Sequence, residues 1–151
     1  MFVHELILRG NGDDLAIIDQ DRRITYRQLQ KAVAICRDHL YAAGVRMHDN
    51  VAIFSRNSAE YIYAYMAITS LGAVAVPINF QLSRREIAYI LKDADIHHLL
   101  TYKTLDLSAA LQQQGFAGTV QQHAIQSLHQ NTGCTPAPLL PADFTAEEPC
   151  V

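Results

Sequence analysis

One stretch of the sequence, residues 50–79, constrains the fold more than any other part. It begins with the short apolar run Val51–Phe54, continues through a helix-like segment, and ends with the apolar run Ala73–Ile78. Gly72 separates the helix from the second run, and Pro77 lies near the end of that run. A parallel pair of strands needs a crossover connection, so this order predicts a βαβ unit. Continuous apolar strands indicate a sheet that is covered on both faces.

The segments on either side extend this pattern. Residues 15–18 and 23–25 are predicted to form a hairpin, because turn-forming residues separate two short β-like runs. Further along, we predict a helix from Ser83 to near Asp95, a strand over 96–102, a helix over 104–114 and a strand over 119–122. The alternation between residues 51 and 102 predicts an α/β fold with a doubly wound, mostly parallel sheet and helices on both faces. Each crossover is expected to be right-handed.

Helix starts are marked by pairs of polar residues three positions apart. In a capping box, each of the two side chains bonds an otherwise unpaired amide of the first helical turn. Three pairs have this spacing: Thr25 with Gln28, Asn57 with Glu60, and Ser83 with Glu86. Glycine accepts the left-handed conformation that ends many helices, and three glycines are placed to do so: Gly44, Gly72 and Gly115.

Length and composition fit one globular domain. The 151 residues carry a net charge of −3, so no basic face indicates a nucleic-acid partner. No apolar run approaches the ~20 residues of a membrane span, and no integral membrane segment is predicted. We predict an α/β subdomain over residues 1–125. Residues 126–151 are rich in proline, alanine, glutamine and threonine, and are predicted to form a connector.

The cysteines and the first residues bear on localisation. Cys36, Cys134 and Cys150 are odd in number and widely spaced, which favours a reducing compartment over a disulfide framework. Residues 1–5 lack the basic region and apolar core of a signal peptide. The sequence therefore predicts a cytoplasmic protein.

Two short motifs suggest ligand sites but are better explained structurally. Gly10-Asn-Gly12 resembles a phosphate loop, but it precedes a strand without the helix that a dinucleotide site needs, so we predict a solvated turn. His97-His98 suggests a metal site. Neighbouring residues on a strand point to opposite faces, so the two imidazoles are not expected to bind one ion.

Four further sets of reactive, aromatic or charged side chains are candidates for a functional site. Asp93 and Asp95 suggest paired carboxylates, but their position at a helix end predicts a solvated face. Cys36 lies on the apolar stripe of a helix, which predicts a buried and inert thiol. Three tyrosines alternate on one helix and are expected to pack in the interior, with the alternative that this helix flanks an acyl tunnel: Tyr61, Tyr63 and Tyr65. Arg56 and Asn57 follow a strand at the sheet edge where α/β proteins bind ligands. Asn57 is nevertheless predicted to cap a helix.

Four segments, in this order, resemble the start of the adenylate-forming superfamily and its acyl-CoA synthetases. They cover roughly the first two-thirds of the chain. His48 stands where the family usually has glycine. The four segments are Ile24-Thr-Tyr-Arg-Gln-Leu, Gly44-Val-Arg-Met-His-Asp-Asn-Val, Asn57-Ser-Ala-Glu-Tyr with Leu71-Gly-Ala-Val-Ala-Val-Pro-Ile-Asn, and Leu82 to Asp95.

The resemblance implies an ATP-dependent enzyme that activates a carboxylic acid as its adenylate and passes the acyl group to coenzyme A. The family binds the phosphates with a Gly/Ser/Thr-rich loop that ends in lysine, and it uses magnesium and a lysine of a C-terminal domain. The lysines of this chain are Lys31, Lys92 and Lys103, and none follows a glycine-rich loop. We therefore expect an N-terminal segment that ends ahead of the chemistry at Cys150-Val151. No catalytic, cofactor-binding or metal-binding residue is assigned, and ATP, magnesium and coenzyme A are implied only for the complete enzyme.

Two alternatives to an inactive ligase segment remain open. An apolar helix at 58–71, uncovered by the rest of the parent enzyme, would favour self-association, which predicts a non-catalytic interaction module and a homo-oligomer. A small α/β domain that binds a ligand at the carboxyl edge of its sheet is the other alternative. The sequence has no glycine-rich phosphate turn to support it.

Overall fold

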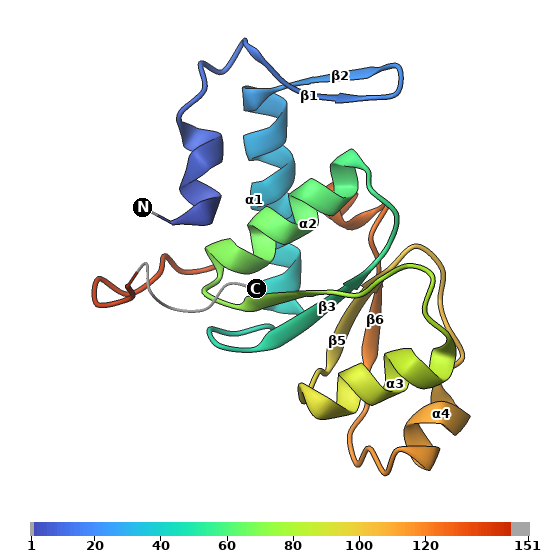
Figure 1. Ribbon diagram of the computed structural model, residues 1–151. Helices are drawn as coiled ribbons and strands as arrows, with labels where there is room; N and C mark the ends of the chain where they lie inside the picture. Colours follow the sequence, from blue (N-terminus) through green and yellow to red (C-terminus); the bar gives the residue numbers. More distant parts are fainter. Residues whose placement is uncertain (1, 146–151) are drawn as a thin grey trace.

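The computed structural model describes residues 2–145 of the protein. Its centre is a four-stranded parallel sheet with the strand order β4-β3-β5-β6, and a separate β1-β2 hairpin lies beside it (Figure 1). The strands and helices are η1 (Val3–Leu8), β1 (Leu15–Asp19), β2 (Arg22–Thr25), α1 (Tyr26–Ala42), β3 (Asn50–Phe54), α2 (Ala59–Ser70), β4 (Val74–Pro77), α3 (Arg84–Asp93), β5 (His98–Thr101), α4 (Ser108–Gln113), β6 (Gln121–Ala124) and η2 (Leu128–Gln130).

The order of the strands makes the sheet doubly wound, as predicted. The chain passes from β3 through α2 to β4, then returns through α3 across β3 to pair β5 on its other side. Helices α1 and α2 cover one face, and α3 and α4 cover the other (Figure 1). The core therefore has two layers, one on each side of the sheet. Val51 and Leu100 belong to the first, and Ala52 and Leu99 to the second.

The caps at the helix starts are mostly those that the spacing predicts. The Thr25 and Ser83 side chains accept the N–H of Gln28 and Glu86, and the second side chain of each box bonds back to the cap. The prediction for Asn57 is wrong. Ser58 is the cap of α2: its backbone is extended, and its Oγ accepts the N–H of Tyr61 at 3.2 Å. The helix therefore begins one residue later than the Asn57–Glu60 spacing suggests.

The ends of several elements differ from the predicted ranges. Helix α4 begins at Ser108 and not near 104, because the Gln122 side chain bonds both the N–H and the C=O of Leu105 and holds that residue in a loop. Strand β6 spans Gln121–Ala124, two residues later than predicted, and β5 is shorter than predicted. Pro77 is the last residue of β4, where its missing N–H removes no bond from the interior of the ladder.

Helix α2 is covered by the chain itself on more than one side. None of its residues is exposed; Ala64, Ala67 and Ile68 are fully buried. Helix α1, η1, β4 and the hairpin surround it. The predicted burial on more than one side is thus confirmed. The uncovered helix that motivated the homo-oligomer is not present, and oligomerisation stays a prediction.

The segment after β6 runs back over the α1–α2 side. Leu128 and Ala137 are buried there, and the Arg37 guanidinium donates to the C=O of Ala137 at 2.9 Å and to that of Pro138. The Asp38 carboxylate accepts the N–H of Ala137 at 2.8 Å. The predicted connector extends to residue 151, and its last part, including Cys150-Val151, lies outside the described residues. Within residues 2–145 no helix is long and apolar enough to cross a membrane.

Candidate functional site

The carboxyl edge of the sheet is the place where this topology separates two loops. The loop after β3 leads to α2 on one face, and the loop after the adjacent strand β5 leads to α4 on the other face. Such a point, where neighbouring connections diverge, leaves a crevice at the strand ends in which α/β proteins bind ligands. The loops that border it are residues 55–58 and 102–107.

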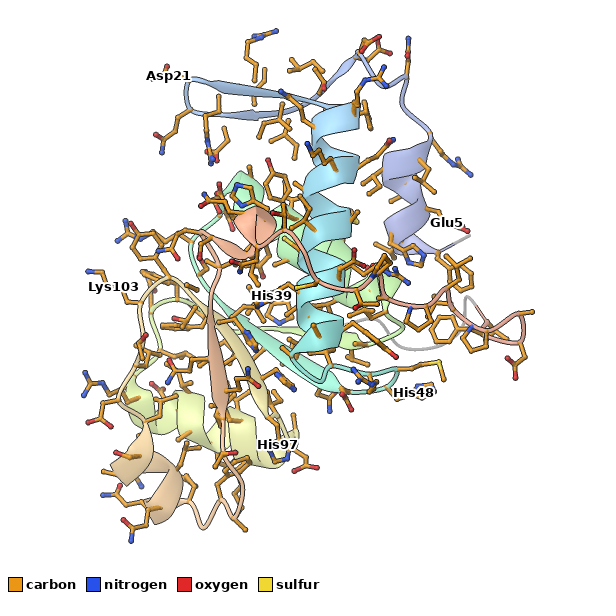
Figure 2. All side chains as sticks on the ribbon, turned by 180° about the vertical axis from the view of Figure 1, so that it is seen from behind. Glu5, Asp21, His39, His48, His97 and Lys103 are labelled. Atoms are coloured by element: carbon orange, nitrogen blue, oxygen red, sulfur yellow. The ribbon has the colours of Figure 1, made fainter. Side chains whose placement is uncertain are left out.

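The two loops present cations that have no carboxylate partner among residues 2–145. Arg56 lies over the Phe80 ring, with its guanidinium carbon 5.0 Å from the ring centroid, and Phe80 stacks on Phe54 at 5.3 Å. Lys103 is exposed at the end of β5, and Figure 2 shows it at the opposite end of the sheet from His97. Neither cation forms an ion pair with a described residue. This edge can therefore attract an anion without first breaking an ion pair.

The backbone around these cations is fixed by hydrogen bonds. The buried Thr101 hydroxyl donates to the C=O of Lys103 at 2.8 Å, and the Gln126 amide donates to that of Tyr102 at 2.6 Å. The N–H of Ile78 likewise bonds the C=O of Ile53 at 2.9 Å. The loops are thus held by the strands, and only the long cationic side chains remain to adjust to a ligand.

The amino end of α2 is not available to an anion, because the protein already fills it. The Asp19 carboxylate at the hairpin tip accepts the N–H of Ala59 at 3.0 Å. Arg22 bonds both Asp19 and Glu60, with 2.5 Å and 3.0 Å to the two oxygens of Glu60. These bonds hold the pKa of Glu60 at about 2, mainly because Arg22 stabilises its charged form. A hollow of about 340 Å³ remains between the hairpin and this helix end, beside Ile18 and Asn57.

The glycine motif forms a turn that caps α1, as predicted, and not a cradle for phosphate. The C=O of Gly12 accepts the N–H of Arg27 at 2.9 Å, and the C=O of Asp14 accepts that of Tyr26 at 3.0 Å. A side chain at Gly10 would meet the Tyr26 ring at 2.3 Å, so a glycine is required there by packing.

His97 and His98 turn to different partners. The His97 ring lies 3.2 Å from both the Asp95 carboxylate and the C=O of Thr119. The His98 ring bonds His123 on the α1 side of the sheet. No group of three or more potential metal ligands is gathered in the part of the chain that the structure describes.

The remaining candidates take the structural places that were predicted for them. Cys36 is 1% exposed in the core, and burial raises the pKa of its thiol to about 12. Asp93 and Asp95 are exposed to solvent. Tyr63 is buried, and two tyrosines on the same helix pack partly buried against the core, namely Tyr61 and Tyr65. The hairpin ion network was missed, because Arg22 and Glu60 lie far apart in the sequence and no spacing rule connects them.

The comparison with protein families settles what kind of chain this is. The sequence model described as AMP-binding enzyme matches residues 5–148. The chain belongs to this family.

Curated relatives agree with this assignment. The chain is 36% identical over 95 residues to a 2-succinylbenzoate–CoA ligase of Bacillus cereus, a match that covers 62% of this chain and 20% of the relative. It is 40% identical over 74 residues to the long-chain-fatty-acid–CoA ligase FadD13 of Mycobacterium tuberculosis, covering 49% of this chain and 15% of the relative. The chain thus spans about a fifth or less of the length of these proteins.

Solved structures match over nearly the whole chain. The o-succinylbenzoate coenzyme A synthetase of Bacillus subtilis in complex with AMP gives a TM-score of 0.76 at 26% identity, covering 95% of this chain and 36% of that one. The N-terminal subdomain of NpsA from Klebsiella oxytoca, in complex with anthranilyl-AMSN, also gives 0.76 at 26% identity, covering 97% and 35%. The fold is therefore that of the N-terminal subdomain of adenylate-forming enzymes, as the sequence resemblance implied.

Proposed function

We propose that this chain provides the N-terminal sheet layer of an AMP-forming, ATP-dependent acid–thiol ligase. Its role there is to hold one wall of the reaction site at the carboxyl edge of the sheet. The observation that carries this proposal is the pair of cations without a described carboxylate partner, Arg56 in the loop after β3 and Lys103 in the loop after β5, in a member of this family. Two of the three substrates of such a ligase, ATP and coenzyme A, are polyanions.

The described residues suit phosphate but not magnesium. Two cations on fixed loops can pair with phosphate oxygens. Carboxylates in the loops and helix starts of this edge already accept hydrogen bonds: Glu86 bonds Ser83, and Asp106 bonds Ser108. Because magnesium prefers several oxygen ligands, we propose that ATP-bound magnesium is held by the complete enzyme and not by these residues.

We propose that the acid is hydrophobic, either a fatty acid or a related acid that includes aromatic ones. Support comes from the relatives, whose names specify long-chain fatty acid, 2-succinylbenzoate and hydroxybenzoate as acids. We further propose a cytoplasmic location, which suits the free thiols of Cys36 and Cys134.

The chain on its own is proposed to be inactive, since none of its lysines follows a glycine-rich loop. The test is acid-dependent exchange of pyrophosphate into ATP, run with fatty and aromatic acids on the isolated chain. We expect no exchange above a blank without protein. Turnover that depends on an acid would contradict the proposal of inactivity.

A binding measurement tests the site itself. Titration calorimetry with ATP and with coenzyme A should show weak binding that Arg56→Gln and Lys103→Gln each reduce several-fold. The matched control is Lys31→Gln, which removes one charge from α1 away from this edge. If Arg56→Gln and Lys103→Gln bound ATP and coenzyme A as tightly as Lys31→Gln does, the two cations would not face the polyanion.

A further inference from the structure

Four histidines line one interface of the molecule, between residues 121–130 and the elements beneath them. His123 on β6 contacts His98 on β5 and His39 on α1, whereas His129 in η2 contacts Tyr63 on α2. Figure 2 labels His39 on α1 where the helix passes the strands. His123 pairs in register with Leu100, which belongs to the core layer under α1. Imidazoles therefore occupy places that aliphatic side chains fill elsewhere on this face.

Three of these rings form a contact cluster. His98 Nδ1 and His123 Nε2 are 3.1 Å apart, and the two rings stack at 5.4 Å. The His39 ring meets His123 edge-on at 5.8 Å. The fourth ring, His129, packs on Tyr63 at 5.4 Å, and its buried Nδ1 has no hydrogen-bond partner among residues 2–145.

Residues 121–130 bury an imidazole where an ordinary strand would bury an aliphatic side chain. Strand β6 reads Gln-Gln-His-Ala, and His123 is the only residue of the strand that is buried. The segment is otherwise held by Ile125 and Leu128, each 1% exposed, and by the bonds of Gln122 to Leu105 and of Gln126 to Tyr102. It pairs with β5 alone within the described sheet.

The surroundings offer the cluster little negative charge. Burial, together with smaller contributions from His98 and His39, lowers the pKa of His123 to about 4. Burial also lowers the pKa values of His98 and His39. Asp49 raises the pKa of His98, and the neighbouring His97 lowers it. The Asp49 carboxylate already accepts the N–H of Arg46 at 2.7 Å.

The geometry limits how many protons the closed cluster holds. One proton can bridge His98 and His123, since an imidazolium N–H can donate to a neutral ring nitrogen. A second proton on this pair would set two N–H groups against each other across 3.1 Å. A proton on His39, whose ring packs edge-on against His123, would place a second positive charge beside the shared proton, so the closed cluster holds one proton. In an opened segment all three imidazoles are free to take a proton. Opening therefore takes up about two protons more than the closed form can hold.

We propose that residues 121–130 form an acid-released strap, which undocks from α1 when the cluster of His39, His98 and His123 is protonated. Opening at low pH, and not at high pH, follows from the lowered pKa values of these histidines. The closed form binds fewer protons than the open form, so its stability is complete above the ordinary histidine pKa of 6.5 and is lost as the pH falls toward about 4. An uptake of two protons raises the opening equilibrium about 100-fold for each pH unit once the pH is about one unit below 6.5, where free imidazoles are mostly protonated.

Hydrogen exchange on the full chain tests the strap, with each pH corrected for the intrinsic exchange rate. Protection over residues 121–130 should fall about 100-fold per pH unit below about pH 5.5, and less steeply between there and 6.5, while β3 keeps its protection. His123→Gln keeps a group that can bond His98 but does not titrate, so the slope should fall to 10-fold or less. His48→Asn is the matched control and should leave the slope unchanged, because it removes a histidine from the turn before β3, outside the cluster, and asparagine tolerates the positive φ of that position.

Two results would overturn the proposal. Residues 121–130 and β3 could lose protection together at every pH, which would mean global unfolding without a separate strap. Alternatively, His123→Gln could keep the wild-type slope. If that variant does not fold, NMR titration of the wild-type histidines decides: the three cluster rings must gain protons together with the loss of amide protection in the strap, and independent titration would contradict the proposal.

Discussion

The ion network at the hairpin tip gives the sharpest test of how this fold is held together. Glu60→Gln removes the charge that pairs with Arg22 and leaves the side-chain shape nearly unchanged. The pKa of Glu60 is lowered from 4.5 to about 2 by its bond to Arg22. At about 1.4 kcal/mol per pH unit this shift would correspond to roughly 3 kcal/mol at neutral pH. The Arg22 side chain is 51% exposed, so solvent screening reduces the expected loss to about 1–2 kcal/mol.

The pH dependence identifies the cause of that loss. A carboxylate with a depressed pKa stabilises the fold above its unfolded value of 4.5, and this contribution is lost as the pH falls toward about 2. Urea denaturation followed by circular dichroism should therefore show a gap between wild type and Glu60→Gln at pH 7 that closes by about pH 2.5. Asp13→Asn is the control, since the exposed Asp13–Arg27 pair should contribute less than about 0.5 kcal/mol. A gap that persists unchanged at low pH would refute the electrostatic explanation.

Three further outcomes are expected. Ser58→Ala should lower the free energy of unfolding by about 1 kcal/mol and Asn57→Ala by less than half of that, because Ser58 is the cap of α2; denaturation curves of the two variants compare them directly. Cys36 should resist a disulfide reagent at pH 8 in the native state while Cys134 reacts, since the Cys36 thiol is buried with a pKa of about 12; mass spectrometry of the labelled peptides identifies the modified residue. Leu91→Ala should cost about 2–5 kcal/mol and Leu91→Met less than about 1.5 kcal/mol, because Leu91 is fully buried between α3 and the sheet.

Local patterns were enough to predict the layered fold. The apolar runs around Val51 and Ala75 and the glycine at Gly72 mark strand, helix and strand without reference to the rest of the chain. Thr25 and Ser83 mark helix starts for the same reason, since a capping box is built from residues three positions apart. The order of the strands was not predicted, because the alternation of elements indicates a doubly wound sheet without fixing which strands are neighbours.

Features made by distant residues were not predicted. The start of α4 depends on the Gln122 side chain, which holds Leu105 from a strand that comes later in the chain. The histidine cluster joins His39, His98 and His123, whose spacing resembles no known motif. The error at Asn57 shows a limit of spacing itself: Ser58 and Asn57 are both good caps, and only the backbone conformation decides between them.

The two ends of the sheet are suited to different tasks. At the amino end, neighbouring turns bond one another: the Asn50 side chain donates to the C=O of Ala94 at 2.8 Å, and the N–H of His48 bonds the C=O of Gly72 at 2.9 Å. Backbone at positive φ, at His48 and Asp95, is held in these turns, where nothing needs to move. At the carboxyl end the connections after β3 and β5 part toward opposite faces, and the cations there bond no described carboxylate. A polyanion at the carboxyl end, as proposed above, would meet these cations without displacing a described carboxylate, whereas the turns at the amino end are bonded to one another.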